Sequence, residues 1–413
     1  MSPGAISLGA LAAAVTLSCV TRLNVGLIAI AMAWLIGVYV SGMSAKEVAA
    51  GFPVDLFLTL TGVTLLFTQA QVNGTLERVA RSSVRLCGGS VGLIPVLFFT
   101  LGALLASAGP GNIATTGLLA PVAMATAIRM RIPLFLMAIM IGNGANSGSL
   151  SPLAPTGLIV NGLMDRIQLP GMELHTWLYN FAAHAFVAGS GFLLFGGIRL
   201  LRRTERGEVI QKEDTTLESR HVVTLCVIGA LVAAVIFLKV HLGMAAFAGG
   251  VALSLMRVAD DAEAIRKMPW GTILMVCGVT VLVSLLERTS GMELFTGFLA
   301  QVATPASILP IVAVMIGLIS AYSSTSGVVL PVFLPMVPGL IENLGSGSAF
   351  GLATTMNVAG HLVDVSPLST IGALCVASAP AGEESRRLFH QLLAWGLSMT
   401  VVGALLCWLF LRG

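Results

Sequence analysis

Apolar segments of membrane-spanning length alternate with short polar connections along almost the whole chain. A helix needs about 20 predominantly apolar residues to cross roughly 30 Å of hydrocarbon. By this criterion the pattern predicts an all-α, polytopic membrane protein. Its ordinary spans are expected at 5–20, 24–42, 53–74 and 175–200 in the first half, and at 222–239, 242–257, 268–288 and 386–411 in the second.

One apolar segment in each half is interrupted by Gly, Ser and Pro. The segments are 133–164 and 347–378, and each contains Ser-Pro-Leu, beginning at Ser151 and at Ser366, 215 positions apart (366 − 151). Proline removes a backbone donor and breaks a helix. The freed backbone groups cannot face lipid and must be buried in protein or line a cavity. Two broken helices at matching positions of two halves are the best pointer in a sequence to the binding site of a transporter.

Each half also contains an apolar region too long for one span and barely long enough for two. These regions are 91–128 and 305–341, and small, turn-forming residues interrupt each of them midway. We expect two re-entrant hairpins whose tips stop within the membrane. The alternative is two ordinary spans in each region, joined by a polar turn at the surface.

These elements divide the chain into a first repeat at 1–203, a charged linker at 204–221 and a second repeat at 222–413. If each hairpin returns to its own side, each repeat crosses the membrane an odd number of times, with four spans and one broken helix. The two repeats then have opposite orientations, which is the inverted repeat of many secondary transporters.

The Lys and Arg residues are distributed unequally between the two sides of this topology. Of the 22, seventeen fall on the side of the linker, and five fall on the other, namely Lys46, Arg166, Lys239, Arg288 and Arg412. Lys and Arg are enriched on the cytoplasmic side of membrane proteins. We therefore expect the linker inside and both termini outside, with the first hairpin entering from the cytoplasm.

The composition excludes several classes of protein. The chain is 56% hydrophobic and 10% charged, whereas soluble domains carry about 25% charged residues. It lacks the GxxxxGK[ST] phosphate loop, so ATP-driven pumping by this chain is not expected. Nucleic-acid binding is not expected either. HExxH and GxSxG motifs are also missing, and the six cysteines are scattered, so we expect neither an enzyme nor a cofactor.

The motif GNGANSGSLSPLAPTG at 142–157 resembles that of dicarboxylate carriers of the MatC (malonate carrier) type. The paired hairpins and broken helices are similar to those of the ion transporter superfamily, which includes the divalent anion/sodium symporters. The resemblance implies sodium-coupled uptake of a small dicarboxylate such as malonate, malate or succinate. It further implies an elevator-type motion, a homodimer and the bacterial inner membrane. Each hairpin tip of the symporters carries Ser-Asn-Thr, of which this chain keeps only Asn112.

Small polar residues at the tips and breaks are the candidate ligands. Four half-helices would direct their positive N-terminal ends at the centre, which favours an anion without Lys or Arg. The candidate substrate ligands are Asn112, Thr115, Asn146, Ser147, Ser149, Ser326, Thr370 and His361. By the resemblance to the symporters, the sodium ligands would come from Ser107, Gly111, Asn112, Ala145, Ser323, Thr325, Ser326 and Asp364. For any of these, the alternative is a residue that only caps a helix break or allows close packing.

Asp364 is the acidic residue that we place deepest within a span. A carboxylate at that depth indicates a function, either as a cation ligand or as a proton carrier. His361 lies three residues earlier and would share its helical face, so the pair could instead be a mutually satisfied structural pair. His184, a lone histidine in an apolar span, is expected to be structural.

Three other functions fit parts of the pattern. A proton-coupled carrier or a sodium/proton antiporter of the same superfamily would use Asp364 as the proton carrier. An anion channel would need a continuous pore, whereas two gates around a central site favour alternating access.

The topology can be tested by labelling introduced cysteines in intact cells. Cysteines in the charged stretch Arg202–Arg220 should resist impermeant thiol reagents, whereas a cysteine at the C-terminus should react. The reverse pattern would invert the orientation of both hairpins.

Overall fold

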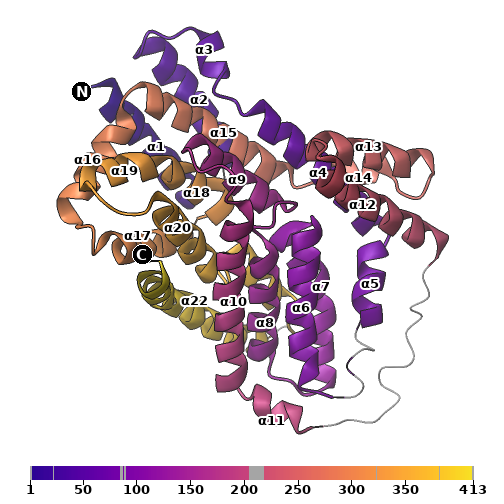
Figure 1. Cartoon of the computed structure of the whole chain (residues 1–413). Helices are drawn as coiled ribbons and strands as arrows, with labels where there is room; N and C mark the ends of the chain where they lie inside the picture. Colours follow the sequence, from indigo (N-terminus) through magenta and orange to yellow (C-terminus); the bar gives the residue numbers. More distant parts are fainter. Residues whose placement is uncertain are drawn as a thin grey trace.

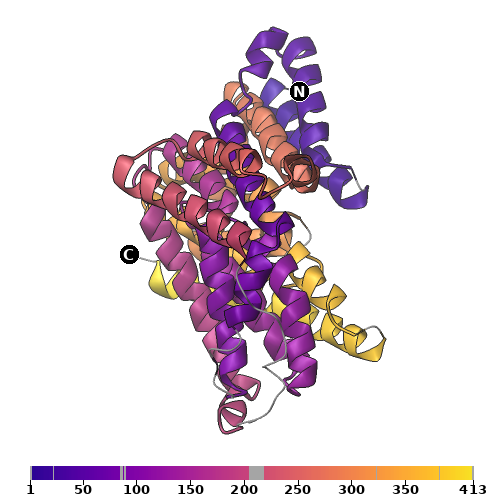
Figure 2. The same cartoon turned by 90° about the vertical axis from the view of Figure 1, so that its right-hand side faces the viewer.

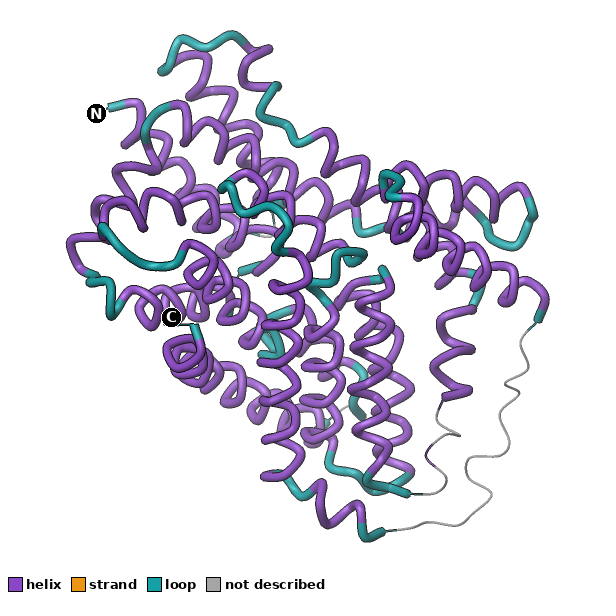
Figure 3. Tube along the Cα trace, viewed as in Figure 1, coloured by secondary structure: helices purple, strands orange, loops and turns teal. Residues whose placement is uncertain are grey.

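The computed structural model describes residues 2–21, 23–83, 87, 90–203, 218–321, 323–380 and 382–411. Within these ranges, every regular element is a helix (Figure 3). Most of the predicted linker, residues 204–217, lies outside the described residues. Four helical segments are long and apolar enough to cross a membrane, namely Gly111–Arg129, Trp270–Arg288, Thr325–Leu344 and Glu383–Phe410.

The helices of the first half begin and end close to the predicted boundaries. They are α1 (Pro3–Val20), α2 (Val25–Tyr39), α3 (Ala45–Ala49), α4 (Val54–Val72), α5 (Thr75–Ser83), α6 (Leu93–Ala108), α7 (Gly111–Arg129), α8 (Leu134–Gly148), α9 (Pro155–Arg166), α10 (Glu173–Leu194) and α11 (Gly197–Leu201). The span expected at 175–200 is two helices, because Gly196 takes a left-handed conformation (φ 95°) between α10 and α11. The expected first broken helix is α8 and α9, with a non-helical turn between them.

The second half follows the same order. Its helices are α12 (Ser219–Leu238), α13 (Leu242–Leu255), α14 (Asp261–Lys267), α15 (Trp270–Arg288), α16 (Gly291–Val302), α17 (Ile308–Ser320), the π-helix η3 (Thr325–Val329), α18 (Leu330–Phe333), the 3₁₀-helix η4 (Leu334–Met336), α19 (Val337–Leu344), α20 (Ala349–Val363), α21 (Thr370–Ala377) and α22 (Glu383–Phe410). The returning arm of the second hairpin is therefore irregular, unlike the continuous α7. Pro331, Pro335 and Pro338 each lack the N–H that a regular α-helix would need.

Glycine pairs bring the outer helices into close contact at corresponding places in the two halves. A Cβ on Gly62 of α4 would overlap the carbonyl oxygen of Gly243 in α13, and a Cβ on Gly278 of α15 would overlap that of Gly26 in α2. The positions correspond at offsets of 216 (278 − 62) and 217 (243 − 26). Helices in a membrane gain packing energy when small residues let their backbones approach, so these crossings favour a tightly packed frame.

The broken helices form the centre of the molecule. Every residue of α8 from Leu136 to Gly148 is buried, as is every residue of α20 from Gly351 to Val363. Helices α6, α7 and α10 stand side by side around α8 in Figure 1, while α17 and α22 pack on α20. In Figures 1 and 2 the N-terminal helices lie at the upper edge, away from the lower ends of α6 and α7.

The two halves are interlocked through their second half-helices. Helix α9, from the first half, contacts η3, α18 and η4 of the second hairpin. Helix α21, from the second half, contacts α7 of the first hairpin. Each break is therefore completed by the hairpin of the other half.

The turns at the two breaks share one tight backbone contact. A Cβ on Gly157 would overlap the carbonyl carbon and oxygen of Ser151, and one on Gly372 would overlap those of Ser366. Because the obstructing atoms are backbone, the contact cannot be relieved by a side-chain rotation.

Replacing either glycine with alanine should therefore destabilise the fold. We expect Gly157→Ala and Gly372→Ala each to cost about 1–3 kcal/mol, as overpacking does in other cores. Thermal unfolding of the purified protein in detergent would measure the loss. Gly162→Ala is the matched control, because it lies in the same helix α9 and a Cβ there would meet nothing within 4 Å. Equal melting temperatures for Gly157→Ala and Gly162→Ala would contradict the prediction.

Candidate functional site

The tip of the first hairpin lies against the first broken helix. Gly109 (φ 143°) and Gly111 (φ 75°) make the turn between α6 and α7 in conformations that favour glycine. A Cβ on Gly111 would lie 3.1 Å from Cδ of Pro155, the first residue of α9. The Ser151 hydroxyl donates a hydrogen bond of 2.7 Å to the carbonyl oxygen of Ser107. The tip and the break are thus held together by close packing and by this partly buried hydrogen bond.

Asn146 joins four elements at this point. Its side-chain oxygen accepts a 2.8 Å hydrogen bond from Nδ2 of Asn112, at the hairpin tip. Its own Nδ2 donates to the carbonyl oxygen of His361 in α20, at 3.1 Å, and its carbonyl oxygen accepts from Nδ2 of Asn180 in α10, at 2.8 Å. Asn146 is fully buried and Asn112 nearly so. The predicted pair of asparagines is therefore in direct contact and reaches the second broken helix.

The tip of the second hairpin meets the end of α20. Ser324 caps η3 by accepting a 3.1 Å hydrogen bond from the backbone N–H of Gly327. The Thr325 hydroxyl donates to Oδ1 of Asp364 at 2.7 Å, and the carbonyl oxygen of Gly360 lies 3.5 Å from the same hydroxyl. Ser369, at the start of α21, is also near the carboxylate. The carboxylate of Asp364 thus lies where the second tip and the second break meet.

The possible His361–Asp364 pair is not the arrangement found. Nδ1 of His361 donates to the carbonyl oxygen of Asn357 one turn earlier, at 2.8 Å. Asp364 follows the last residue of α20 and bonds to Thr325 instead. Helix α20 ends at Val363, between the two residues, and their side chains bond to different partners.

The remaining candidates differ in their surroundings. Ser147 and Ser149 are fully buried, and their hydroxyls donate to carbonyl oxygens within α8, at 2.7 Å each. Thr115 is buried with no hydrogen-bond partner for its hydroxyl among the described residues. Thr370 is exposed at the start of α21. Ser323 and Ser326 are half-buried near the second tip, and Ala145 is fully buried in α8.

The electrostatics of the region come from helix ends. The N-cap residues of α7, α9 and α21 make no side-chain hydrogen bond to the helix, so the first turns keep the partial positive charge that favours an anion. Two N–H groups of these turns are already bonded: that of Ile113 donates to Oδ1 of Asn112 at 3.0 Å, and that of Gly157 donates to the carbonyl oxygen of Ser149 at 2.9 Å. The basic residues Arg129, Arg166 and Arg288 are each the last residue of their helix, α7, α9 and α15. For α7 and α9, the positively charged side chain therefore lies at the opposite end of the helix from the hairpin tip and the break.

A cavity of about 380 Å³ lies between the outer helices and α9. The start of α4, from Phe52 to Leu56, forms one wall, and Thr280 of α15 lies on another. Asp165 and Arg166, at the end of α9, supply the remaining charged groups. The cavity is at the opposite end of α9 from the hairpin tip.

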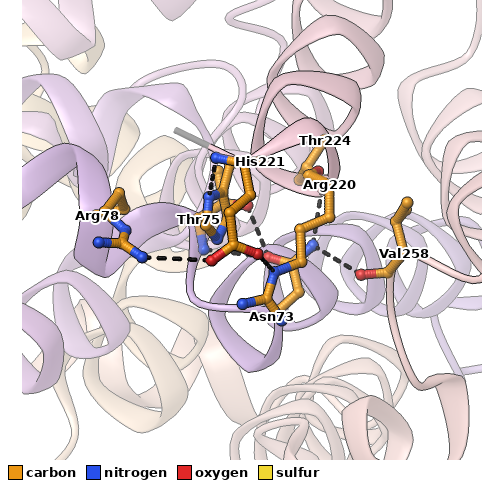
Figure 4. A network of polar contacts seen from close by, with 8 residues as sticks. Asn73, Thr75, Arg78, Arg220, His221, Thr224 and Val258 are labelled. Carbon is orange, nitrogen blue, oxygen red and sulfur yellow. Dashed lines mark hydrogen bonds and ion pairs between the residues drawn. The ribbon is translucent and has the colours of Figure 1, made fainter. Parts of the chain in front are cut away.

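A separate polar network fastens α5 to α12 (Figure 4). Asn73 Nδ2 donates to the Thr224 hydroxyl at 2.8 Å and to the carbonyl oxygen of Val258 at 3.2 Å. Glu218 pairs with Arg78 at 3.5 Å and with Arg220 at 2.9 Å. Since these groups bond to one another across helices, we interpret the network as holding the helices together and not as a binding site.

Sequence reasoning missed the polar residues that surround Asn146 from other helices. Asn180 bonds to Asn146, and Asn143 bonds to His184 at 2.9 Å. The signal was present, because Thr176, Asn180 and His184 recur every four residues along α10. That spacing places them on one helical face.

A family model matches the first part of the chain. Residues 1–149 match the family model of the "Dicarboxylate carrier protein MatC N-terminus", which confirms the resemblance over that part of the chain. This part includes the first hairpin, Asn112 and Asn146. No curated protein matches the chain.

Two solved structures share the fold. One is MtrF of Neisseria gonorrhoeae, described as illuminating a class of antimetabolite efflux pumps, with 11% identity over 91% of this chain and 84% of that chain and a TM-score of 0.62. The other is the YdaH transporter of Alcanivorax borkumensis, described as having an unusual topology, with 14% identity over 88% and 86% and a TM-score of 0.53. The chain therefore has the all-helical fold of membrane transporters, with several apolar helices.

Proposed function

We propose that this chain is a secondary active transporter that moves small dicarboxylates, of the malonate, malate or succinate type, by alternating access. The observation that carries the proposal is the buried contact between Asn112 and Asn146. It joins a hairpin tip to a broken helix inside the region that matches the dicarboxylate carrier model. Two broken helices with facing hairpins are typical of transporter binding sites.

The anion would be held by amides, hydroxyls and helix ends. Asn112 and Thr115 lie in the first turns of α7, whose N-terminus has no side-chain cap. Their side chains, and N–H groups in the first turns of α7, α9 and α21 that are not already bonded, would donate to carboxylate oxygens. Ser326, Thr370 and His361 would contribute from the second half, with Ser147 and Ser149 supporting the break from within α8.

Sodium ions would offset the charge of the substrate. A dianion beside the Asp364 carboxylate is unfavourable in a low-dielectric site unless cations accompany it. Oxygen atoms suit sodium, and the contact between Thr325 and Asp364 supplies two of them, with Ser323 and Ser326 nearby. Ser107, Gly111, Asn112 and Ala145 would provide oxygens for a second ion at the first tip.

The corresponding elements of the two halves would move as one unit during transport. Hairpins and broken helices would move together against a frame of outer helices, such as α2 with α15 and α4 with α13, in an elevator-like motion. The protein would act as a homodimer in the inner membrane of a bacterium, with both termini outside.

The binding site is tested by Asn112→Ala and Asn146→Ala. Loss of a hydrogen bond to a charged group costs about 1.5–3 kcal/mol, so each variant should bind dicarboxylate roughly ten- to a hundred-fold more weakly. Equilibrium binding of radiolabelled malonate, malate and succinate to purified protein would measure the change. Asn161→Ala, in α9, is the control, because its side chain makes no hydrogen bond to any residue that the structure describes. Unchanged affinity in both test variants would move the site elsewhere.

The coupling ion is tested by Asp364→Asn in proteoliposomes. If sodium is coupled, the variant keeps an oxygen ligand but loses a charge, so half-maximal uptake should require more sodium. If protons are coupled, the variant imitates the protonated state, so net uptake should collapse while exchange survives. Uptake of the unmodified protein in sodium-free buffer, driven by an inward proton gradient, would overturn the sodium proposal.

A further inference from the structure

A ladder of six buried polar side chains runs between α10 and α20. Thr176, Asn180 and His184 lie on α10, and Thr354, Asn357 and His361 lie on α20. All six are at most 1% exposed. They recur at intervals of three or four residues on each helix, so each set lies on one helical face, and the two helices contact each other. In order along the helices we call them three rungs: Thr176 with Thr354, Asn180 with Asn357, and His184 with His361.

Aromatic contacts confirm the direction of the two helices. The Phe350 ring, near the start of α20, lies 6.3 Å from the His175 ring and 6.0 Å from the Tyr179 ring, near the start of α10. Both helices therefore begin at the same face of the molecule. At the inner end, His184 and His361 are close enough to interact electrostatically. The ladder runs from that face to the Asn146 junction.

Seven polar atoms of this ladder have no hydrogen-bond partner among the described residues. They are the hydroxyls of Thr176 and Thr354, Oδ1 of Asn180, Nε2 of His184, both side-chain polar atoms of Asn357, and Nε2 of His361. Each unsatisfied buried group costs about 1–3 kcal/mol, and whole domains are stable by only about 5–15 kcal/mol. A fold could not tolerate seven such losses in one place, so these atoms must have partners.

The chemistry of the atoms indicates what the partner is. Asn143 uses its Nδ2 to donate to Ile139, so its Oδ1 accepts from His184, and Nδ1 of His184 carries the proton. Nδ1 of His361 also carries its proton, because its partner is a carbonyl oxygen. Both Nε2 atoms are thus free acceptors. With the two amide oxygens they form a set of four groups that only accept, beside one NH₂ group that only donates and two hydroxyls that can do either.

We propose that this ladder binds a chain of water molecules between the face where α10 and α20 begin and the Asn146 junction. Water donates two hydrogen bonds, so it satisfies a tract that is rich in acceptors and carries no counter-charge for a bound ion. The chain of water would give the site beside His361 a solvent route along α10 and α20. This inference does not depend on which substrate the protein carries.

Hydroxyl-radical footprinting of the purified full-length protein tests the proposal directly. Radicals generated by X-rays in H₂¹⁸O arise from bound water, so they label buried residues that contact it. His184 and His361 should take up ¹⁸O at a rate comparable to that of exposed His175, whereas buried Phe98 should remain unlabelled. If both histidines stay as unlabelled as Phe98, the ladder is dry and the proposal is wrong.

Substitutions on α20 locate the water. Asn357→Leu should remove the middle rung and abolish labelling of His361. Thr355→Val is the matched control, because Thr355 is equally buried but its hydroxyl bonds within the helix to the carbonyl oxygen of Gly351, at 2.8 Å. Labelling should persist in this control. Undiminished labelling of His361 in Asn357→Leu would overturn the route, and Thr176→Val at the outer rung serves if Asn357→Leu does not fold.

Discussion

Backbone groups released by a broken helix must find partners away from lipid, and this constraint governs the whole structure. Helices α8 and α20 meet it by complete enclosure, with every residue of their central stretches buried. The other helices are arranged to provide that enclosure. Both turns are then closed by the same contact, in which Gly157 and Gly372 lie directly on the backbone of Ser151 and Ser366.

Equivalent positions of the two broken helices carry different chemistry. Asn146 corresponds to His361, and Ser149 corresponds to Asp364, each at an offset of 215. The first half thus presents amide and hydroxyl groups, and the second presents an imidazole and a carboxylate.

The sequence predicted the elements that are determined by residues next to one another in the chain. The two breaks contain Gly, Ser and Pro in a row, and the arms of the first hairpin are the apolar runs on either side of Gly109-Pro110-Gly111. Asn112 and Asn146 were both expected to bind the substrate, which stays a prediction, and the structure places them in contact. The orientation of the repeats and the depth of the hairpin tips remain predictions, because both are defined relative to a membrane.

Other features depend on which helices become neighbours, and sequence alone does not give that. Asp364 bonds to Thr325, from a separate hairpin, although His361 is closer in sequence. The importance of Asn180 and Asn357 emerges only when α10 and α20 are seen in register. The irregular arm after Thr325 reflects three prolines, whose effect on helix type depends on the local packing.

The interlocking of the halves has a consequence for biogenesis. Helix α9 rests on η3, α18 and η4, which lie more than 150 residues later (325 − 166 = 159). During synthesis the first half therefore waits in the membrane without the partner that completes its break. Long-range contacts of this kind slow folding and leave intermediates open to misassembly. The chain would depend on insertion machinery to shield the first polar turn from lipid until the second hairpin arrives.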